Sequence, residues 1–234
     1  MCKINTKLTV FFSLIAKDLI SDVVPSLKTS DTGLKALSWM EIFRISHLPI
    51  VNNRDFLGLI SDTDIYDLNM ADEPIGNHNL SLFSPFVFSG QHIYEVIDLI
   101  ARLKLTVVPV LDEKSKYLGL ITMNDLVQRF GDLMAVNNPG GILVLELHQN
   151  DYSLTQIAQI IESNDARILS LYVAKHENSM KMEVVIKINR TDFSSIKQTF
   201  ERYDYHIKAS YMSEQEVDSL YENRYESFMK YLNI

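Results

Sequence analysis

The sequence predicts an α+β protein with two copies of a β-α-β-β-α unit, followed by a different domain of order βαββαβ. Three observations support this prediction. The heptads "GLISDTD" (58–64) and "GLITMND" (119–125) agree at five of seven positions when Ser and Thr count as equal. Pro49 and Pro109 stand sixty positions apart in the matching stretches "SHLPIV" and "TVVPVL". Beyond Ile142 the rhythm of apolar residues changes. Self-similarity at a fixed period indicates repeated units that share a core.

Within each copy, the apolar spacing predicts a helix, two short strands around a turn, and a second helix that opens at the heptad. The turns are expected at 52–55 and 112–116. Repeat one is predicted over about 14–70 and repeat two over about 78–135, in a paired module of 1–137. The residues expected to face the core from the first helices are Leu34, Leu37, Met40, Phe43, Val96, Ile97, Ile100 and Leu103.

Asn138-Pro139-Gly140-Gly141 can continue neither helix nor strand, so we predict a linker at 138–141 that acts as a hinge. After it come an alternating strand, a helix that opens with the capping-box pattern Ser153 to Gln156, a hairpin, a helix and a strand. This βαββαβ order is ferredoxin-like. The strands are expected at 142–148, 168–174, 182–188 and 205–211, and a final helix from Ser213 completes a domain of 142–234.

The chain has 234 residues, 47% hydrophobic and 22% charged, a composition typical of a soluble globular protein. Its net charge of −8 is spread evenly, without a basic block, which argues against nucleic-acid binding because phosphate backbones repel an acidic surface. Cys2 is the only cysteine. The sequence therefore has no disulfide framework and no CxxC metal site, as expected in a reducing, cytoplasmic setting.

Lys3 and Lys7 precede the apolar run Leu8 to Ala16, a pattern that superficially resembles a signal peptide. Lys17 and Asp18 follow at once and no A-x-A cleavage site appears, so we interpret this run as a helix leading into the first repeat. No run approaches the ~20 apolar residues of a membrane helix, and we expect no membrane association.

The repeated heptads admit two interpretations. Ser61-x-x-Asp64 and Thr122-x-x-Asp125 place a hydroxyl at a helix N-cap and a carboxylate three residues later, which starts a helix and contributes about 1 kcal/mol. A glycine ahead of a helix N-terminus also lets a ligand approach the backbone, and the free amides favour an anion. A carboxylate can accept two hydrogen bonds from a ribose diol. The residues alone leave capping and ligand binding open.

The two copies together resemble a tandem pair of CBS domains, the cystathionine-β-synthase type, over about residues 14–135. That family carries G-h-h-T/S-x-x-D after an h-x-h-P-V strand, folds as β-α-β-β-α units, and forms two clefts for adenosine-containing ligands. The resemblance implies AMP, ADP, ATP or S-adenosylmethionine as a regulatory ligand, and no obligatory cofactor.

The resemblance also assigns roles to residues. Asp64 and Asp125 would hold ribose hydroxyls, with Ser61 and Thr122 beside the ribose or phosphates. His47, where copy two has Val107, favours the first cleft for a charged nucleotide and leaves the second for a less charged adenosyl compound or none. His47, Leu48, Val107 and Val108 would contact adenine or phosphates, Val24 and Val87 would line the base pocket, and Arg44, Arg102 and Lys104 are interpreted as solvated.

The βαββαβ domain resembles an ACT domain, a small regulatory module that often pairs side by side and binds amino acids. Asp151 and Leu154 fit the usual turn after the first strand, but Ser153 stands where a glycine is common, so we do not expect amino-acid binding. The combination resembles bacterial acetoin-utilisation-type regulators.

The six histidines show no zinc spacing, and no Walker loop, G-x-S-x-G or G-x-G-x-x-G appears. We therefore predict a non-catalytic, cytoplasmic bacterial sensor that forms a homodimer and acts on an unidentified enzyme or transporter. The alternative is a scaffold whose Ser/Thr-x-x-Asp motifs only cap helices.

Overall fold

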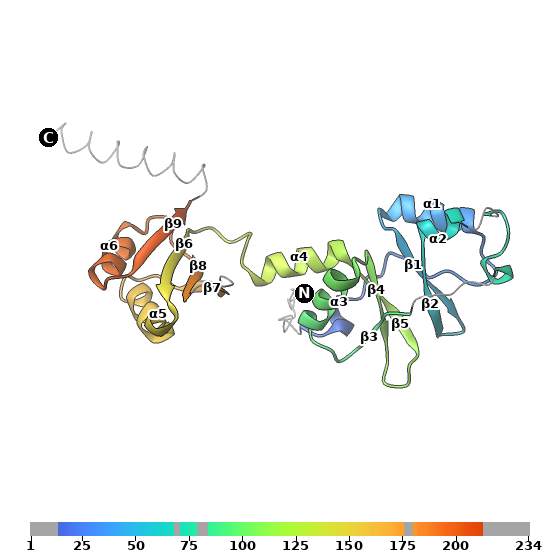
Figure 1. Ribbon diagram of the computed structural model, residues 1–234, viewed down its shortest axis with the longest axis horizontal. Helices are drawn as coiled ribbons and strands as arrows, with labels where there is room; N and C mark the ends of the chain where they lie inside the picture. Colours follow the sequence, from blue (N-terminus) through green and yellow to red (C-terminus); the bar gives the residue numbers. More distant parts are fainter. Residues whose placement is uncertain (1–13, 68–70, 79–83, 176–179, 213–234) are drawn as a thin grey trace, which may run out of the picture. The chain divides into compact units, whose positions relative to one another are not determined.

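The computed structural model describes residues 14–67, 71–78, 84–175 and 180–212. The chain divides into two compact units, Met1–Arg129 and Phe130–Ile234 (Figure 1). The predicted final helix from Ser213 and most of the apolar run before Ala16 lie outside the described residues. Within the described ranges, no helix is long and apolar enough to cross a membrane.

The first unit contains both copies of the repeated motif in the predicted order, except for the last residues of the helix that ends copy two. A short 3₁₀ helix precedes each copy: η1 (Ala16–Leu19) before copy one and η2 (Ile75–Asn77) before copy two. Copy one consists of α1 (Gly33–Phe43), β1 (His47–Asn52), β2 (Asp55–Ser61) and α2 (Asp62–Asp67), and copy two of β3 (Val87–Phe88), α3 (Ile93–Leu103), β4 (Val107–Leu111), β5 (Tyr117–Thr122) and α4 (Met123–Leu133).

The strands of the two copies pair in the same way. β1 and β2 are antiparallel with His47 opposite Ser61, and β4 and β5 are antiparallel with Val107 opposite Thr122. Each hairpin has one register irregularity, at equivalent positions. The predicted first strand is present in copy two as β3, parallel to β4, whereas copy one keeps a single parallel bridge from Leu27 to β1.

Each copy is preceded by a segment that packs against the other copy. Ile15 forms an antiparallel bridge with His92, so the segment before copy one lies on copy two. In the same manner Pro74 bridges Thr32, so the segment before copy two lies on copy one. This exchange ties the two copies together.

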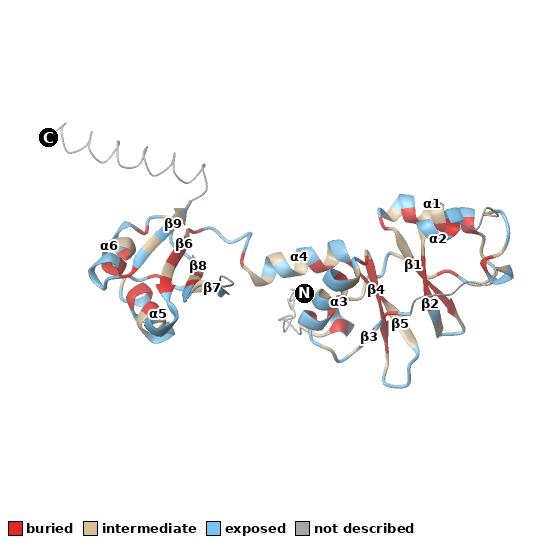
Figure 2. Cartoon of the chain, viewed as in Figure 1, coloured by how far each residue is buried: buried red, intermediate tan, exposed pale blue. Residues whose placement is uncertain are grey.

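The strands supply most of the core, and Figure 2 shows β1, β2, β4 and β5 buried along much of their length. The helices bury one stripe each. In α1 the predicted stripe is wrong in part, because Gly33, Ala36 and Met40 are buried whereas Leu34 is 52% exposed. Gly33 lies so close to α2 that a Cβ there would be 2.8 Å from Ile65 Cγ2. The equivalent positions of α3 are buried as well: Ile93, Val96 and Ile100.

The second unit is one four-stranded antiparallel sheet with the predicted order of elements. Its strands follow the order β7-β8-β6-β9 across the sheet. The side chains of α5 and α6 pack with one face of the sheet around Phe193 and Phe200. The elements are β6 (Ile142–His148), η3 (Gln149–Asp151), α5 (Leu154–Glu162), β7 (Ile168–Lys175), β8 (Lys181–Ile188), α6 (Ser194–Arg202) and β9 (His206–Tyr211).

The glycines of the predicted linker are held within the second unit. Gly141 donates its N–H to the Arg190 carbonyl at 2.9 Å and accepts from the Ile188 N–H at 3.0 Å. Lys187 Nζ donates to the Gly140 carbonyl at 2.9 Å. Gly140 has φ +134°, and a Cβ on Gly141 would lie 2.0 Å from the Phe193 ring. Both positions therefore require glycine for packing and conformation inside this unit.

Candidate functional site

The first heptad forms a reciprocal cap at the junction of β2 and α2. The N–H and hydroxyl of Ser61 both donate to Asp64 Oδ2, at 2.8 and 2.7 Å, and the Asp64 N–H donates to Ser61 Oγ at 3.1 Å. The second oxygen of Asp64, Oδ1, accepts no hydrogen bond from the described residues. Because Asp64 is exposed, this oxygen is open to a ligand hydroxyl.

The second heptad builds a similar but more enclosed junction between β5 and α4. The Thr122 hydroxyl donates to Asp125 Oδ2 at 2.7 Å, and the Asp125 N–H donates to Thr122 Oγ1 at 3.0 Å. Thr122 is only 7% exposed, and Asp125 is half-buried. The predicted hydroxyl–carboxylate pairs are thus confirmed as local contacts, and both of them act as helix caps.

His47 is the third residue of the first junction, because it pairs with Ser61 across the β1–β2 hairpin. Its Nδ1 lies 3.0 Å from the hydroxyl of Thr106, a residue of copy two. Burial lowers the pKa of His47, while the charges of Asp62 and Asp64 raise it by less. The ring is therefore neutral at neutral pH, beside two carboxylates.

The apolar residues assigned to the ligand lie in the protein core. Leu48, Val107 and Val108 are fully buried, so a ligand could contact them only after a rearrangement. Val24 is half-buried and lies ahead of the Leu27 bridge. Val87 pairs with Val110 at the far end of β4 and lines a hollow of about 440 Å³ beside α3. The structure brings three residues together at each junction, and these are His47, Ser61 and Asp64 in copy one and Val107, Thr122 and Asp125 in copy two.

The glycines of the two heptads do not both open the backbone to a ligand. Gly58 has φ +151°, a conformation that favours glycine. Gly119 instead makes room for the protein itself, since a Cβ there would lie 2.4 Å from Ile20 Cγ2. The expectation that this glycine admits a ligand is wrong for copy two.

The cationic side chains near the copies are exposed, as predicted. Arg44 and Lys104 end α1 and α3 in the left-handed conformation, with φ 56° and 53°. Arg102 lies 3.6 Å from Asp98 on the same helix face, and both side chains are largely exposed. None of these three side chains forms a hydrogen bond or ion pair with Asp64 or Asp125.

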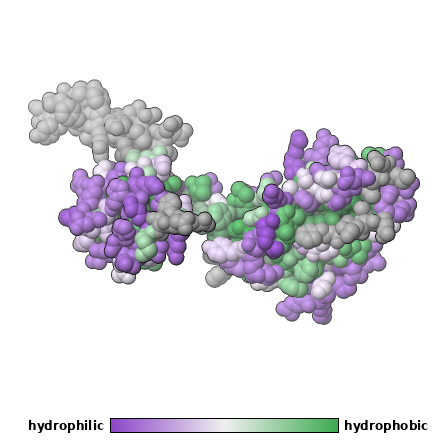
Figure 3. All heavy atoms as spheres, in the orientation of Figure 1, coloured by the Kyte–Doolittle hydropathy of each residue, from purple (hydrophilic) through white to green (hydrophobic). Residues whose placement is uncertain are grey.

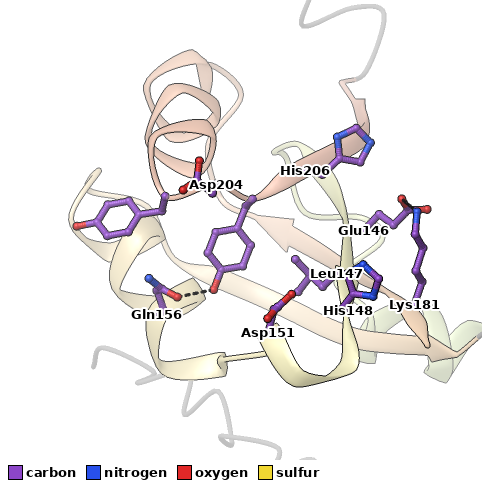
Figure 4. Close-up of a pocket in the computed structure, with 10 residues that line it drawn as sticks. Glu146, Leu147, His148, Asp151, Gln156, Lys181, Asp204 and His206 are labelled. Atoms are coloured by element: carbon purple, nitrogen blue, oxygen red, sulfur yellow. Dashed lines mark hydrogen bonds and ion pairs between the residues drawn. The ribbon is translucent and has the colours of Figure 1, made fainter.

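A hollow of about 600 Å³ in the second unit was not predicted from the sequence. It lies where the β6 end, the α5 start and the α6–β9 turn meet, and Figure 4 shows Asp151, Asp204 and His206 around it. The Tyr205 hydroxyl donates to Gln156 Oε1 at 2.8 Å on one side, and Lys181 pairs with Glu146 at 2.7 Å on the other. Three segments far apart in sequence form this hollow, so no local pattern marks it.

The predicted capping box of α5 forms only in part. Ser153 accepts from the Gln156 N–H at 3.3 Å as expected, but the Gln156 side chain accepts a hydrogen bond from Tyr205 and does not return to the helix start.

Among the described residues, no three His, Cys, Asp or Glu side chains are grouped closely enough to hold a metal ion.

Comparison with known proteins bears on the first unit. A model of the CBS domain matches residues 16–71 and 79–132. The inosine-5'-monophosphate dehydrogenase of Methanocaldococcus jannaschii is 23% identical over 148 residues, which are 62% of this chain and 29% of the enzyme. The chain thus spans less than a third of that relative's length.

Among solved structures, a CBS domain pair/ACT domain protein from Thermotoga maritima aligns with a TM-score of 0.45 and 21% identity, over 50% of this chain and 97% of that one. CBSX2, solved in complex with AMP, aligns with a TM-score of 0.44 and 17% identity, over 51% and 98%. The family model matches each of the two repeated units in turn, and the chain therefore contains a tandem pair of CBS domains.

Proposed function

We propose that this protein is a non-catalytic regulator whose CBS pair binds an adenosine-containing ligand. The observation that carries the proposal is the free Oδ1 of Asp64, which lies at a helix start beside a hydroxyl and a histidine. A carboxylate oxygen of this kind suits the vicinal hydroxyls of a ribose, and a neighbouring N–H donor suits a phosphate.

The first junction is the better site for a charged nucleotide. Ser61 and Asp64 are accessible there, and His47 offers a ring nitrogen. The second junction has the buried Thr122 and the apolar Val107 in the equivalent places, so it lacks the accessible hydroxyl and the ring nitrogen of the first. A less charged adenosyl compound such as S-adenosylmethionine is the ligand for that cleft, if it is filled.

The second unit supports a regulatory role. Its βαββαβ order and the strand order β7-β8-β6-β9 agree with a ferredoxin-like, ACT-like module. We infer that this module relays the ligand state to a partner enzyme or transporter in the cytoplasm. The hollow beside Asp151 is its candidate effector site, although Ser153 replaces the glycine common in ACT domains.

A homodimer fits the surface of the first unit. Apolar side chains remain visible there in Figure 3, whereas the face of the second unit that is shown is mostly hydrophilic. Each of the four described α-helices of the CBS pair carries one apolar or aromatic side chain that is more than 60% exposed: Ile42, Tyr66, Tyr94 and Val127. Exposed apolar and aromatic side chains favour an interface between copies.

A scaffold without ligand is the second candidate, and one observation favours it. Ser61 and Asp64 cap the helix through three reciprocal hydrogen bonds, so the motif has a structural purpose without nucleotide. The two candidates differ in what the aspartates do for binding.

Calorimetric titration with AMP, ADP, ATP and S-adenosylmethionine tests the proposal. We expect AMP, the ligand found in CBSX2, to bind. Asp64→Ala should weaken binding by about 1.5–3 kcal/mol, because a charge-assisted hydrogen bond is lost. Asp125→Ala should have that effect only on a ligand of the second cleft.

Asp67→Ala is the matched control, since Asp67 is an exposed carboxylate at the other end of α2. It should leave affinity unchanged. If none of the four compounds binds the wild-type protein and Asp64→Ala lowers only stability, the scaffold interpretation replaces the sensor.

A further inference from the structure

Three hydrogen bonds connect Thr106 of copy two to Ser46 and His47 of copy one. The Ser46 N–H donates to Thr106 Oγ1 at 3.0 Å, and the same oxygen lies 3.0 Å from His47 Nδ1. The Thr106 N–H also points at His47 Nδ1, at 3.4 Å. A single residue of the second copy thus holds the histidine of the first.

The direction of these bonds fixes the histidine tautomer. Because Thr106 Oγ1 accepts from Ser46, its own hydrogen is free to be donated to His47 Nδ1. The Thr106 N–H is a second donor aimed at the same nitrogen. A nitrogen that faces two donors carries no proton, so the hydrogen of the neutral ring is on Nε2.

The charges around the ring belong to α2. Asp62 and Asp64 raise the pKa of His47, but burial lowers it by more. No cationic side chain is among the causes of this shift. From the copy-two side only the uncharged Thr106 contacts the ring through hydrogen bonds. His47 Nε2 has no hydrogen-bond partner among the described residues and is not enclosed, so its N–H is a free donor.

The second junction has no equivalent arrangement. Ser46 and Thr106 occupy equivalent positions of the two copies, but Val107 stands where copy one has His47. The Ser46 hydroxyl makes no hydrogen bond to the described residues of copy two. The hydrogen bonds that Thr106 makes to copy one therefore have no counterpart at the second cleft.

We propose that Thr106 is a positioning residue that keeps His47 as the Nε2–H tautomer, so that the first cleft presents one neutral donor to the phosphate of an adenine nucleotide. This inference rests on the proposed function for its ligand. It also makes the phosphate preference of copy one depend on a side chain of copy two.

The test combines nitrogen NMR of the histidine rings with titration of AMP and adenosine. Thr106→Val removes the hydroxyl at nearly constant shape, Thr106→Ser keeps it, and Ser46→Ala is the matched control in copy one. A His47→Gln variant assigns the His47 signals among the six histidines. Circular dichroism of each variant checks that it is folded.

In the wild-type protein, the ¹⁵N shifts should show His47 protonated on Nε2. Thr106→Val should give a mixture of tautomers and a higher pKa of His47, because a donor that stabilises the neutral ring is lost. AMP affinity should fall about threefold to tenfold while adenosine affinity stays the same. Thr106→Ser and Ser46→Ala should behave as wild type.

Unchanged tautomer and titration in Thr106→Val would overturn the proposal, as would an equal response to Ser46→Ala. If the tautomer depends on Thr106 but AMP does not bind the wild-type protein, the positioning is correct and the proposed ligand is wrong. If AMP binds and Thr106→Val weakens AMP and adenosine equally, Thr106 acts on the fold of the cleft and not through the phosphate donor.

Discussion

The two CBS copies agree in their backbone and differ at their polar edges. Arg44 and Lys104 end the first helices in the same left-handed conformation. Ile60 and Ile121, each two residues after the heptad glycine, are both fully buried. Strand pairing and its irregularity also repeat. These buried positions and backbone conformations are therefore the same in both copies.

The polar edges show the opposite. Asp64 Oδ2 accepts two hydrogen bonds from an accessible Ser61, whereas Asp125 Oδ2 accepts one from a buried Thr122. His47 has no counterpart in copy two. The comparison teaches that the same backbone junction can present two different chemical surfaces, so the two clefts should not be treated as equal sites.

The largest effects are expected where the copies agree. Ile60→Ala and Ile121→Ala should each lower the free energy of unfolding by about 2–5 kcal/mol, since each leaves a cavity at a fully buried position. Trp39, the only tryptophan, lies in α1, so urea unfolding followed by its fluorescence reports on the first unit. A difference between the two variants larger than about 2 kcal/mol would show that the cores are not equivalent.

The heptad glycines Gly58 and Gly119 offer a sharper test of how the copies differ. The first is needed for its backbone conformation, and the second for the space that Ile20 occupies. Gly58→Ala and Gly119→Ala should each destabilise the first unit by about 1–3 kcal/mol, the first through backbone strain and the second through overpacking against Ile20. In an Ile20→Ala background, Gly119→Ala should lose most of its effect while Gly58→Ala keeps it. Urea unfolding of the three single and two double variants measures this. If Ile20→Ala relieved the effect of both glycine substitutions, the distinction would be wrong.

Much of the fold was predictable because the repeat is written into the sequence. The heptads, the prolines and the turn at 52–55 place β1, β2, β4 and β5 correctly. The stripe of α1 was predicted only in part, with Met40 correct, because the buried positions Gly33 and Ala36 carry small residues that do not mark a core face. Aligning this helix with α3, where Ile93 and Val96 are equivalent, would have shown its true phase.

The candidate site was predictable only as far as it is local. Ser61 with Asp64, and Thr122 with Asp125, are three residues apart and meet through helix geometry. Thr106 could not be identified, because it reaches His47 from 59 positions away across the contact between copies. The hollow of the second unit was missed for the same reason, since distant loops form it.

The smallest effect concerns the surface contact between the two hairpins. Lys116 Nζ lies 2.6 Å from Asp55 Oδ1, with both side chains about half exposed. A double-mutant cycle of Asp55→Asn and Lys116→Gln, read by urea unfolding, should give a coupling of about 0.2–1 kcal/mol that fades in about 1 M salt. The Arg102–Asp98 pair within α3 is the control for an ion pair inside one copy.

A larger coupling that resists salt would mean that the hairpin ends hold the copies together. The structure argues otherwise, because the Tyr117 N–H donates to the Arg54 carbonyl at 2.8 Å, and the Phe56 and Tyr117 rings stack at 6.5 Å between their centroids. Burial raises the pKa of Tyr117, which agrees with a ring withdrawn from solvent. These contacts remain when the ion pair is removed, so the pair should adjust the junction of the copies and not create it.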